Sequence, residues 1–267
     1  MQRAALEIAL LAPLAGLLGA QIVLRHLAFF THGVGAAAFP GLVVAGPAGI
    51  PPALAALGVG GAFAGLLERL ARRGRMAFDA ATALLLVIAL AVGIVLASDV
   101  YESGSGVDQL LFGSLLAIGT GELWATAGAV AIAAITAGLA RRSWIAAGFD
   151  GGGASAGRLS ARTADWLLVG SITVAVVVSL DAIGALLVSG LLVVPAAIAR
   201  LFARSVVELE LLAAALALAL GLIGLRIAYE LDVPPGAAIA TLGGAIFAIA
   251  LLGRSLAPRA HLRRAVR

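Results

Sequence analysis

The sequence predicts an all-α protein that crosses a membrane eight or nine times. Of its 267 residues, 62% are hydrophobic and only 12% are charged. A soluble domain is roughly half apolar and about a quarter charged. The mean hydropathy is +1.11, and the charges fall between long uncharged runs. A single membrane domain spanning residues 1–267 is therefore expected.

The uncharged runs follow one another along the whole chain, and a spanning helix needs about 20 mostly apolar residues. The second of them, which contains no Asp, Glu or Arg, is long enough for two spans. The runs cover residues 8–24, 26–67, 80–98, 123–140, 166–199, 211–225 and 233–253.

Prolines divide these runs. Pro47, Pro51 and Pro52 mark a turn inside the second run, because proline and glycine punctuate secondary structure. Breaks are also expected near Pro40 and Pro195. A broken helix is tolerated in a membrane only where protein or a cavity satisfies the freed backbone groups.

The arginines indicate the orientation of the chain. Every basic residue is arginine, and all but Arg3 and Arg226 can be placed on the same side of the membrane. The positive-inside rule makes this side cytoplasmic. The C-terminus is then cytoplasmic, while nine spans would put the N-terminus outside and eight would put it inside.

Several familiar activities are excluded by missing residues. The chain has no cysteine and three scattered histidines, so neither thiol chemistry nor a self-contained zinc-enzyme site is expected. It has no lysine, and therefore no Walker A motif. The pI of about 10.9 could suit nucleic acid, but the arginines end apolar runs, which favours membrane orientation. We expect neither an enzyme nor a nucleic-acid partner.

An acidic stretch is expected at the outer surface. No arginine lies between Arg75 and Arg141. Acids in this stretch would concentrate cations at an entrance, although a plain solvated loop would look the same. The acids are Asp99, Glu102, Asp108 and Glu122.

The longest hydrophilic stretch, about residues 141–165, is expected on the cytoplasmic side. It contains Phe149, Asp150, Ala154 and Gly157 together with a run of three further glycines. Such a loop could dock a soluble partner, whereas its glycines would also suit a flexible linker.

Three motifs carry a family resemblance. Residues 184–200 read GALLVSGLLVVPAAIAR, residues 231–236 read LDVPPG, and residues 108–114 read DQLLFGS. In their order and spacing along the chain, the three motifs resemble those of the membrane permeases of zinc- and manganese-type ABC importers. These permeases are relatives of the vitamin B12 and siderophore permeases. The resemblance covers nearly the whole chain and implies a B12-importer-like permease fold. The motif positions that it marks as structural are Gly184, Pro195, Arg200, Asp232, Pro234, Pro235 and Gly236.

The resemblance also implies partners. It predicts a homodimer in a bacterial plasma membrane, two cytoplasmic ATPases that hydrolyse ATP, and an extracytoplasmic metal-binding protein. The hydrophilic stretch would then form a coupling segment that inserts into the ATPase. Phe149, Asp150 and Ala154 match its pattern, and Gly157 lies one position from the usual glycine. No cofactor would be permanently bound.

The resemblance implies a metal site at the start of the second span, where the family carries an aspartate and, four residues later, a histidine. This chain has His32 and Ala36. A histidine in so long an uncharged stretch is a functional candidate, and imidazole favours zinc over manganese or calcium. The alternative is that His32 is hydrogen-bonded to a neighbouring helix.

The predicted function is a permease for a divalent metal, with zinc preferred and manganese or iron behind it. One alternative is a permease for a metal chelate such as a siderophore or cobalamin. Another is a gradient-driven secondary transporter, which would use membrane-embedded acids. Asp181 is the only acid expected well inside an apolar run.

Overall fold

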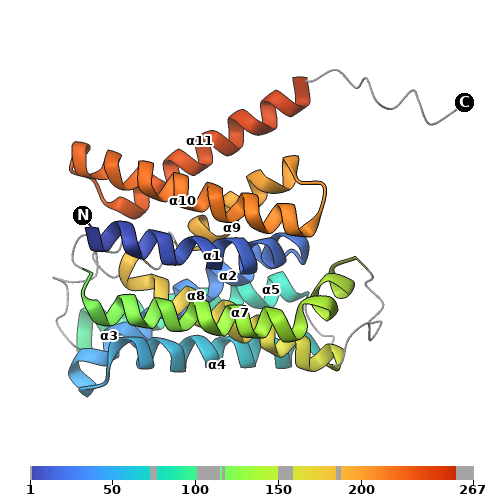
Figure 1. Cartoon of the computed structure of the whole chain (residues 1–267). Helices are drawn as coiled ribbons and strands as arrows, with labels where there is room; N and C mark the ends of the chain where they lie inside the picture. The colour runs from blue at the N-terminus through green and yellow to red at the C-terminus, as the bar shows by residue number, and fades with distance from the viewer. Residues whose placement is uncertain are drawn as a thin grey trace, which may run out of the picture.

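The computed structural model describes residues 2–72, 77–100, 115, 118–149, 159–184 and 188–256. Within these residues the protein is a bundle of helices with no β-strand, as predicted (Figure 1). The elements are α1 (Gln2–Leu24), α2 (Ala28–Ala37), α3 (Phe39–Ala48), α4 (Pro52–Arg72), α5 (Phe78–Val95), the π-helical turn η1 (Leu96–Val100), α7 (Thr120–Phe149), α8 (Ala161–Ile183), α9 (Val188–Phe202), α10 (Val206–Leu231) and α11 (Pro235–Leu256).

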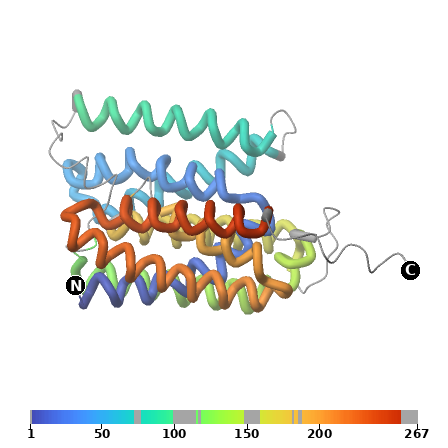
Figure 2. Tube along the Cα trace, turned by 90° about the horizontal axis from the view of Figure 1, so that it is seen from above, coloured from blue at the N-terminus to red at the C-terminus, as the bar shows by residue number. Residues whose placement is uncertain are grey.

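The described residues cross the bundle nine times. Eight of these crossings are apolar helices long enough to span a membrane, with α2 and α3 counted as one, and α9 is a shorter apolar helix. The N-terminus lies at one end of the bundle and the last described turn of α11 at the other, as Figures 1 and 2 both show. The structure thus favours nine spans over eight.

Prolines shape the bundle less than the sequence suggests. Pro13, Pro47 and Pro195 all lie inside helices. No break occurs at Pro195, because α9 runs through it, although α9 is a short helix of 15 residues. The turn attributed in part to Pro47 instead begins at Gly49, whose φ of 66° is left-handed. A carbonyl freed by proline inside a membrane helix can be satisfied by neighbouring groups.

The break near Pro40 is confirmed. Helix α2 ends at Ala37 and α3 begins at Phe39, so proline occupies the first turn of α3. There its missing N–H costs no hydrogen bond. The two short helices together make one crossing of Ala28–Ala48.

Helix α1 is the central element and packs on α7, α9 and α10. Two glycines of α1 allow the close approach. A Cβ at Gly16 would lie 2.6 Å from the backbone oxygen of Glu210, and one at Gly19 would overlap the backbone oxygen of Leu192. Small residues let membrane helices approach closely, so these two positions bring α9 and α10 against α1.

The ends of α10 are set by local chemistry. Ser205 accepts a hydrogen bond from the backbone N–H of Glu208, and the Glu208 carboxylate accepts one from the backbone N–H of Arg204. This arrangement resembles a capping box, except that the carboxylate accepts from the residue before the N-cap. At the other end, Asp232 has a left-handed φ of 51° and α11 starts at Pro235. The predicted stop and restart at residues 231–236 is confirmed.

Candidate functional site

His32 lies between α2 and α9. Its Nδ1 is 3.2 Å from the hydroxyl oxygen of Ser189, and the imidazole is half-buried. Phe30 and Val34 on the same helix are fully buried and anchor α2 in the core. The imidazole is thereby held against the second residue of α9 with part of its surface open.

The elbow before α2 positions His32. The backbone N–H of Arg25 donates to the backbone oxygen of Gln21, and that of Leu27 donates to the backbone oxygen of Ile22. These two hydrogen bonds satisfy carbonyls in the last turn of α1. His26 then takes a left-handed φ of 57°, which few residues other than glycine adopt. The chain reverses here and α2 starts two residues later.

Helix α9 is short for a membrane crossing. Its 15 residues give a length of about 22 Å, against a hydrocarbon thickness of about 30 Å. Its far end is held by Arg200, which donates to the backbone oxygen of Val23 at 3.0 Å. This hydrogen bond holds the end of α9 against the end of α1.

Gly184 ends α8 in the left-handed region, with a φ of 93°. It is buried, and its backbone N–H donates to the oxygen of Leu180 at 2.7 Å. The motif of residues 184–200 thus contains a helix stop, then α9 with Pro195 inside it, and finally Arg200 as an anchor. Residues 185–187 lie outside the described part of the chain.

One of the four predicted outer acids is fully described. Glu122 lies in the first turn of α7 and accepts a hydrogen bond from the backbone N–H of Gly119 at 3.0 Å. The backbone of Asp99 belongs to η1. Glu102 and Asp108 lie outside the described residues. The acidic mouth stays a prediction.

A buried acid was missed by the sequence analysis. Glu7 on α1 is 1% exposed, and its Oε1 accepts a 2.6 Å hydrogen bond from the hydroxyl of Thr126 on α7. Glu7 is thus a second acid within a candidate span, beside Asp181, which is expected inside an apolar run and whose side chain lies outside the described part of the structure. Glu7 directly precedes the first uncharged run, so the sequence reading treated it as the boundary of the span.

The hydrophilic stretch expected on the cytoplasmic side is helical at both ends. Helix α7 continues to Phe149 and α8 starts at Ala161, and residues 150–158 between them lie outside the described part of the chain. Asp150, Ala154 and Gly157 lie outside the described residues, as does the side chain of Phe149. Their part in docking an ATPase remains a prediction.

An ion pair joins this segment to the elbow before α2. Arg25 Nη2 and Asp165 Oδ1 are 2.6 Å apart, and the two side chains are 18% and 37% exposed. Asp165 is in the second turn of α8, and Arg25 directly follows α1. A second pair, Arg141 with Glu210 at 2.6 Å, joins α7 to α10.

The described residues hold no group of three or more His, Cys, Asp or Glu side chains that could bind a metal ion. If His32 binds a metal ion, it would supply one strong ligand, with the Ser189 hydroxyl beside it. A permeation site must release its ion as well as bind it. A site with few ligands would bind a metal ion weakly enough for the ion to leave again.

Comparison with known proteins gives a consistent result. The ABC 3 transport family matches residues 1–254. The "Manganese transport system membrane protein MntC" of Halalkalibacterium halodurans is 28% identical over 94% of this chain and 86% of its own length. The "Probable iron transport system membrane protein" of Haemophilus influenzae is 28% identical, over 94% and 92% respectively.

The fold is found in a solved structure. A chain of PsaBC from Streptococcus pneumoniae, solved in complex with a Fab, aligns with a TM-score of 0.83 and 24% identity. The alignment covers 94% of this chain and 90% of that one. At this identity the likeness is evidence for the fold alone, and it agrees with the predicted permease architecture.

Proposed function

This chain belongs to the ABC 3 transport family, and from that premise we propose that it carries zinc across a bacterial plasma membrane. It is a permease of the metal-importing ABC class, and it makes or breaks no bond in its cargo. Energy would come from ATP hydrolysed by a separate cytoplasmic subunit. The gradient-driven alternative loses its support with this membership.

The observation that carries the choice of zinc is His32. This imidazole is half-buried in the second turn after the elbow, with its Nδ1 3.2 Å from the hydroxyl oxygen of Ser189. Imidazole nitrogen suits zinc, whereas manganese prefers carboxylate and carbonyl oxygen. Manganese is the second candidate, because relatives bear that metal in their names.

We propose that the pathway lies between two copies of the chain. A single copy gathers no cluster of three or more metal-binding side chains among its described residues. Two copies facing each other would bring two His32 side chains to one path. The cargo would still bind weakly, as transport requires.

The proposed orientation follows the arginines. Arg25, Arg69, Arg141, Arg200 and Arg254 lie toward the helix ends that face one side of the bundle. By the positive-inside rule this side is cytoplasmic. The described end of α11 is then cytoplasmic, and the start of α1 is extracytoplasmic, where a metal-binding protein would deliver the ion.

The Arg25–Asp165 ion pair would transmit the conformational change of the ATPase to α2. The cytoplasmic segment before α8 would move when ATP is bound, and Asp165 would pull on Arg25. Arg25 precedes the left-handed turn at His26, and α2 with His32 follows. The ion pair thus gives the docking side a short mechanical route to the candidate ligand.

The test is metal uptake into vesicles that contain the chain and its ATPase, with zinc, manganese and iron offered separately. Wild-type vesicles should accumulate zinc only when ATP is present. His32→Ala should lower zinc uptake about tenfold with the folded yield intact. His32→Asp should shift the preference toward manganese, since a carboxylate replaces the imidazole.

Thr31→Val is the matched control. Thr31 is fully buried beside His32, and its hydroxyl bonds only to Leu27 of its own turn. This variant should transport normally. Full zinc uptake by His32→Ala would reduce His32 to a structural residue, and uptake of a siderophore complex in place of the free ions would support the chelate alternative.

A further inference from the structure

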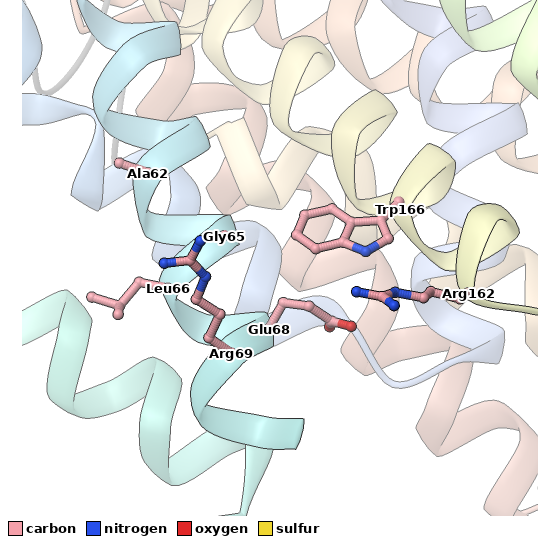
Figure 3. A pocket seen from close by; sticks show the side chains of 7 residues that line it. All are labelled: Ala62, Gly65, Leu66, Glu68, Arg69, Arg162 and Trp166. Carbon is pink, nitrogen blue, oxygen red and sulfur yellow. The ribbon is translucent and has the colours of Figure 1, made fainter. Parts of the chain in front are cut away.

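A pocket of about 480 Å³ opens between the ends of α4 and α8 that carry the basic residues, away from His32 (Figure 3). Both helices are long enough to span a membrane and they pack on each other. The pocket is thus at the end of two spans, at the level where headgroups meet the hydrocarbon. Its lining residues are Ala62, Gly65, Leu66, Glu68, Arg69, Arg162 and Trp166.

The rim of the pocket is basic. Arg69 comes from α4 and Arg162 from the first turn of α8, and both side chains are exposed. Glu68 is the only acid in the lining. In the sequence Arg72, Arg73 and Arg75 follow, and their side chains lie outside the described part of the structure. Arginine clusters immediately cytoplasmic of a membrane helix attract anionic lipids, with about 1 kcal/mol per residue near the surface.

The interior of the pocket is apolar. Ala62, Gly65 and Leu66 are on one face of α4, at the spacing that places side chains together on a helix. A Cβ at Gly65 would meet no atom within 4 Å, so this wall is open. Trp166 is 40% exposed and forms another wall. Tryptophan is enriched where the membrane meets water.

We infer that this pocket binds one anionic phospholipid of the cytoplasmic leaflet. Arg69 and Arg162 hold the phosphodiester, and an acyl chain lies along the wall formed by Ala62, Gly65 and Leu66. The apolar wall favours a lipid over free phosphate, which would gain nothing from it. The position between two membrane spans favours a lipid over a soluble protein surface. His32 does not line this site, whereas Arg162 also belongs to the stretch 141–165 that is proposed to dock the ATPase, so the test must distinguish the two roles.

Native mass spectrometry of the full chain tests the proposal, with phosphatidylglycerol or phosphatidylcholine as the added lipid. The wild type should retain phosphatidylglycerol in preference to phosphatidylcholine. The double variant Arg69→Gln with Arg162→Gln should retain phosphatidylglycerol about tenfold less well. Arg3→Gln with Arg226→Gln removes the same charge at the opposite end of the bundle and should change nothing.

A third variant separates the lipid from its phosphate. Gly65→Leu fills the apolar wall and keeps both arginines, so it should weaken retention of phosphatidylglycerol. Addition of inorganic phosphate should displace little lipid from the wild type. The proposal fails if phosphatidylglycerol is retained equally by the Arg69/Arg162 variant. It also fails if inorganic phosphate displaces all of the phosphatidylglycerol from the wild type. A third contrary result would be that the Arg69/Arg162 variant retains the lipid but no longer binds the ATPase subunit.

Discussion

Helices α1 and α11 have nearly the same mean hydropathy, 1.9 and 2.0, yet 67% of the α1 span is buried and only 17% of the α11 span. Helix α11 lies at the edge of the bundle in Figure 1, whereas α1 is packed inside it. Hydropathy therefore reports that each helix crosses the membrane, and not what surrounds it there. Lipid tails are as apolar as a protein core, so apolar surface does not drive a helix inward.

The two helices differ in where their small and polar residues lie. Helix α1 buries Glu7 and Gln21, each 1% exposed, and packs through Gly16 and Gly19. At Gly244 of α11, by contrast, an added Cβ would meet nothing within 4 Å. Two other crossings show that higher hydropathy does not mean deeper burial. The crossing Ala28–Ala48 has a mean hydropathy of 1.5 and is 78% buried, whereas the crossing Phe78–Ser98 has a mean hydropathy of 2.8 and is 22% buried. The most apolar crossing is thus among the least buried within the chain.

The largest expected effect is a steric one. Gly19→Leu places a side chain against the backbone of Leu192, which cannot move as a side-chain tip can. We expect a loss of about 3 kcal/mol or more, since overpacking a core costs typically about 1–3 kcal/mol. Thermal unfolding in detergent measures it. Gly244→Leu is the control. Equal losses of stability in both variants would contradict the difference in packing between α1 and α11.

The ion pair Arg25–Asp165 should have the next largest effect. Asp165→Asn should lower stability by about 1 kcal/mol, because the pair is only partly buried. It should also lower the amount of metal moved per ATP hydrolysed. The exchange of Arg25→Asp with Asp165→Arg should restore that ratio in part.

Arg141→Gln is the matched comparison, because it breaks a pair of the same 2.6 Å length between α7 and α10. Stability should fall by a similar amount, while the ratio of transport to hydrolysis stays at the wild-type value. If both variants uncouple equally, the Arg25–Asp165 pair has no special part in transmission.

A smaller effect is expected at Thr126. This fully buried hydroxyl donates across helices to the Glu7 carboxyl, so Thr126→Val should cost about 1–2 kcal/mol. Thr82 is equally buried, but its hydroxyl bonds to Phe78 within its own helix. Thr82→Val should cost only a few tenths of a kcal/mol. Chemical denaturation of both variants, compared side by side, would reveal whether the buried acid ties α1 to α7.

The smallest effect is expected on the outer face of α11. Ile249 is 69% exposed, and its replacement by alanine should change stability by no more than about 0.5 kcal/mol. Unfolding is best followed at several protein concentrations. A loss above about 1 kcal/mol that grows on dilution would mean that a second copy covers this face.

The sequence alone predicted the helical fold, the family and most of the crossings, because long apolar runs and proline-glycine boundaries are local signals. It predicted the restart of α11 at Pro235 for the same reason. It did not predict that Asp165 pairs with Arg25, since the two residues are 140 positions apart. It also misjudged Glu7, because hydropathy does not indicate which face of a helix is turned inward.

The candidate ligand was found in part. His32 is predicted because it stands where the resembled family carries an aspartate, within a long uncharged stretch. Ser189 is not predicted, since a serine in an apolar run is common. The hydrogen bond between them fits the predicted alternative of a helix-bound histidine. A half-buried imidazole can serve both purposes, so only the uptake experiment separates them.

The shortness of α9 has a consequence for the lipid around the protein. Its 15 residues make a helix of about 22 Å, which is shorter than a hydrocarbon layer of about 30 Å. A short helix that faces lipid is accommodated by local thinning of the bilayer. Helix α9 packs on α1, α10 and α11, so these neighbours cover it and a change of bilayer thickness should act first on the longer helices.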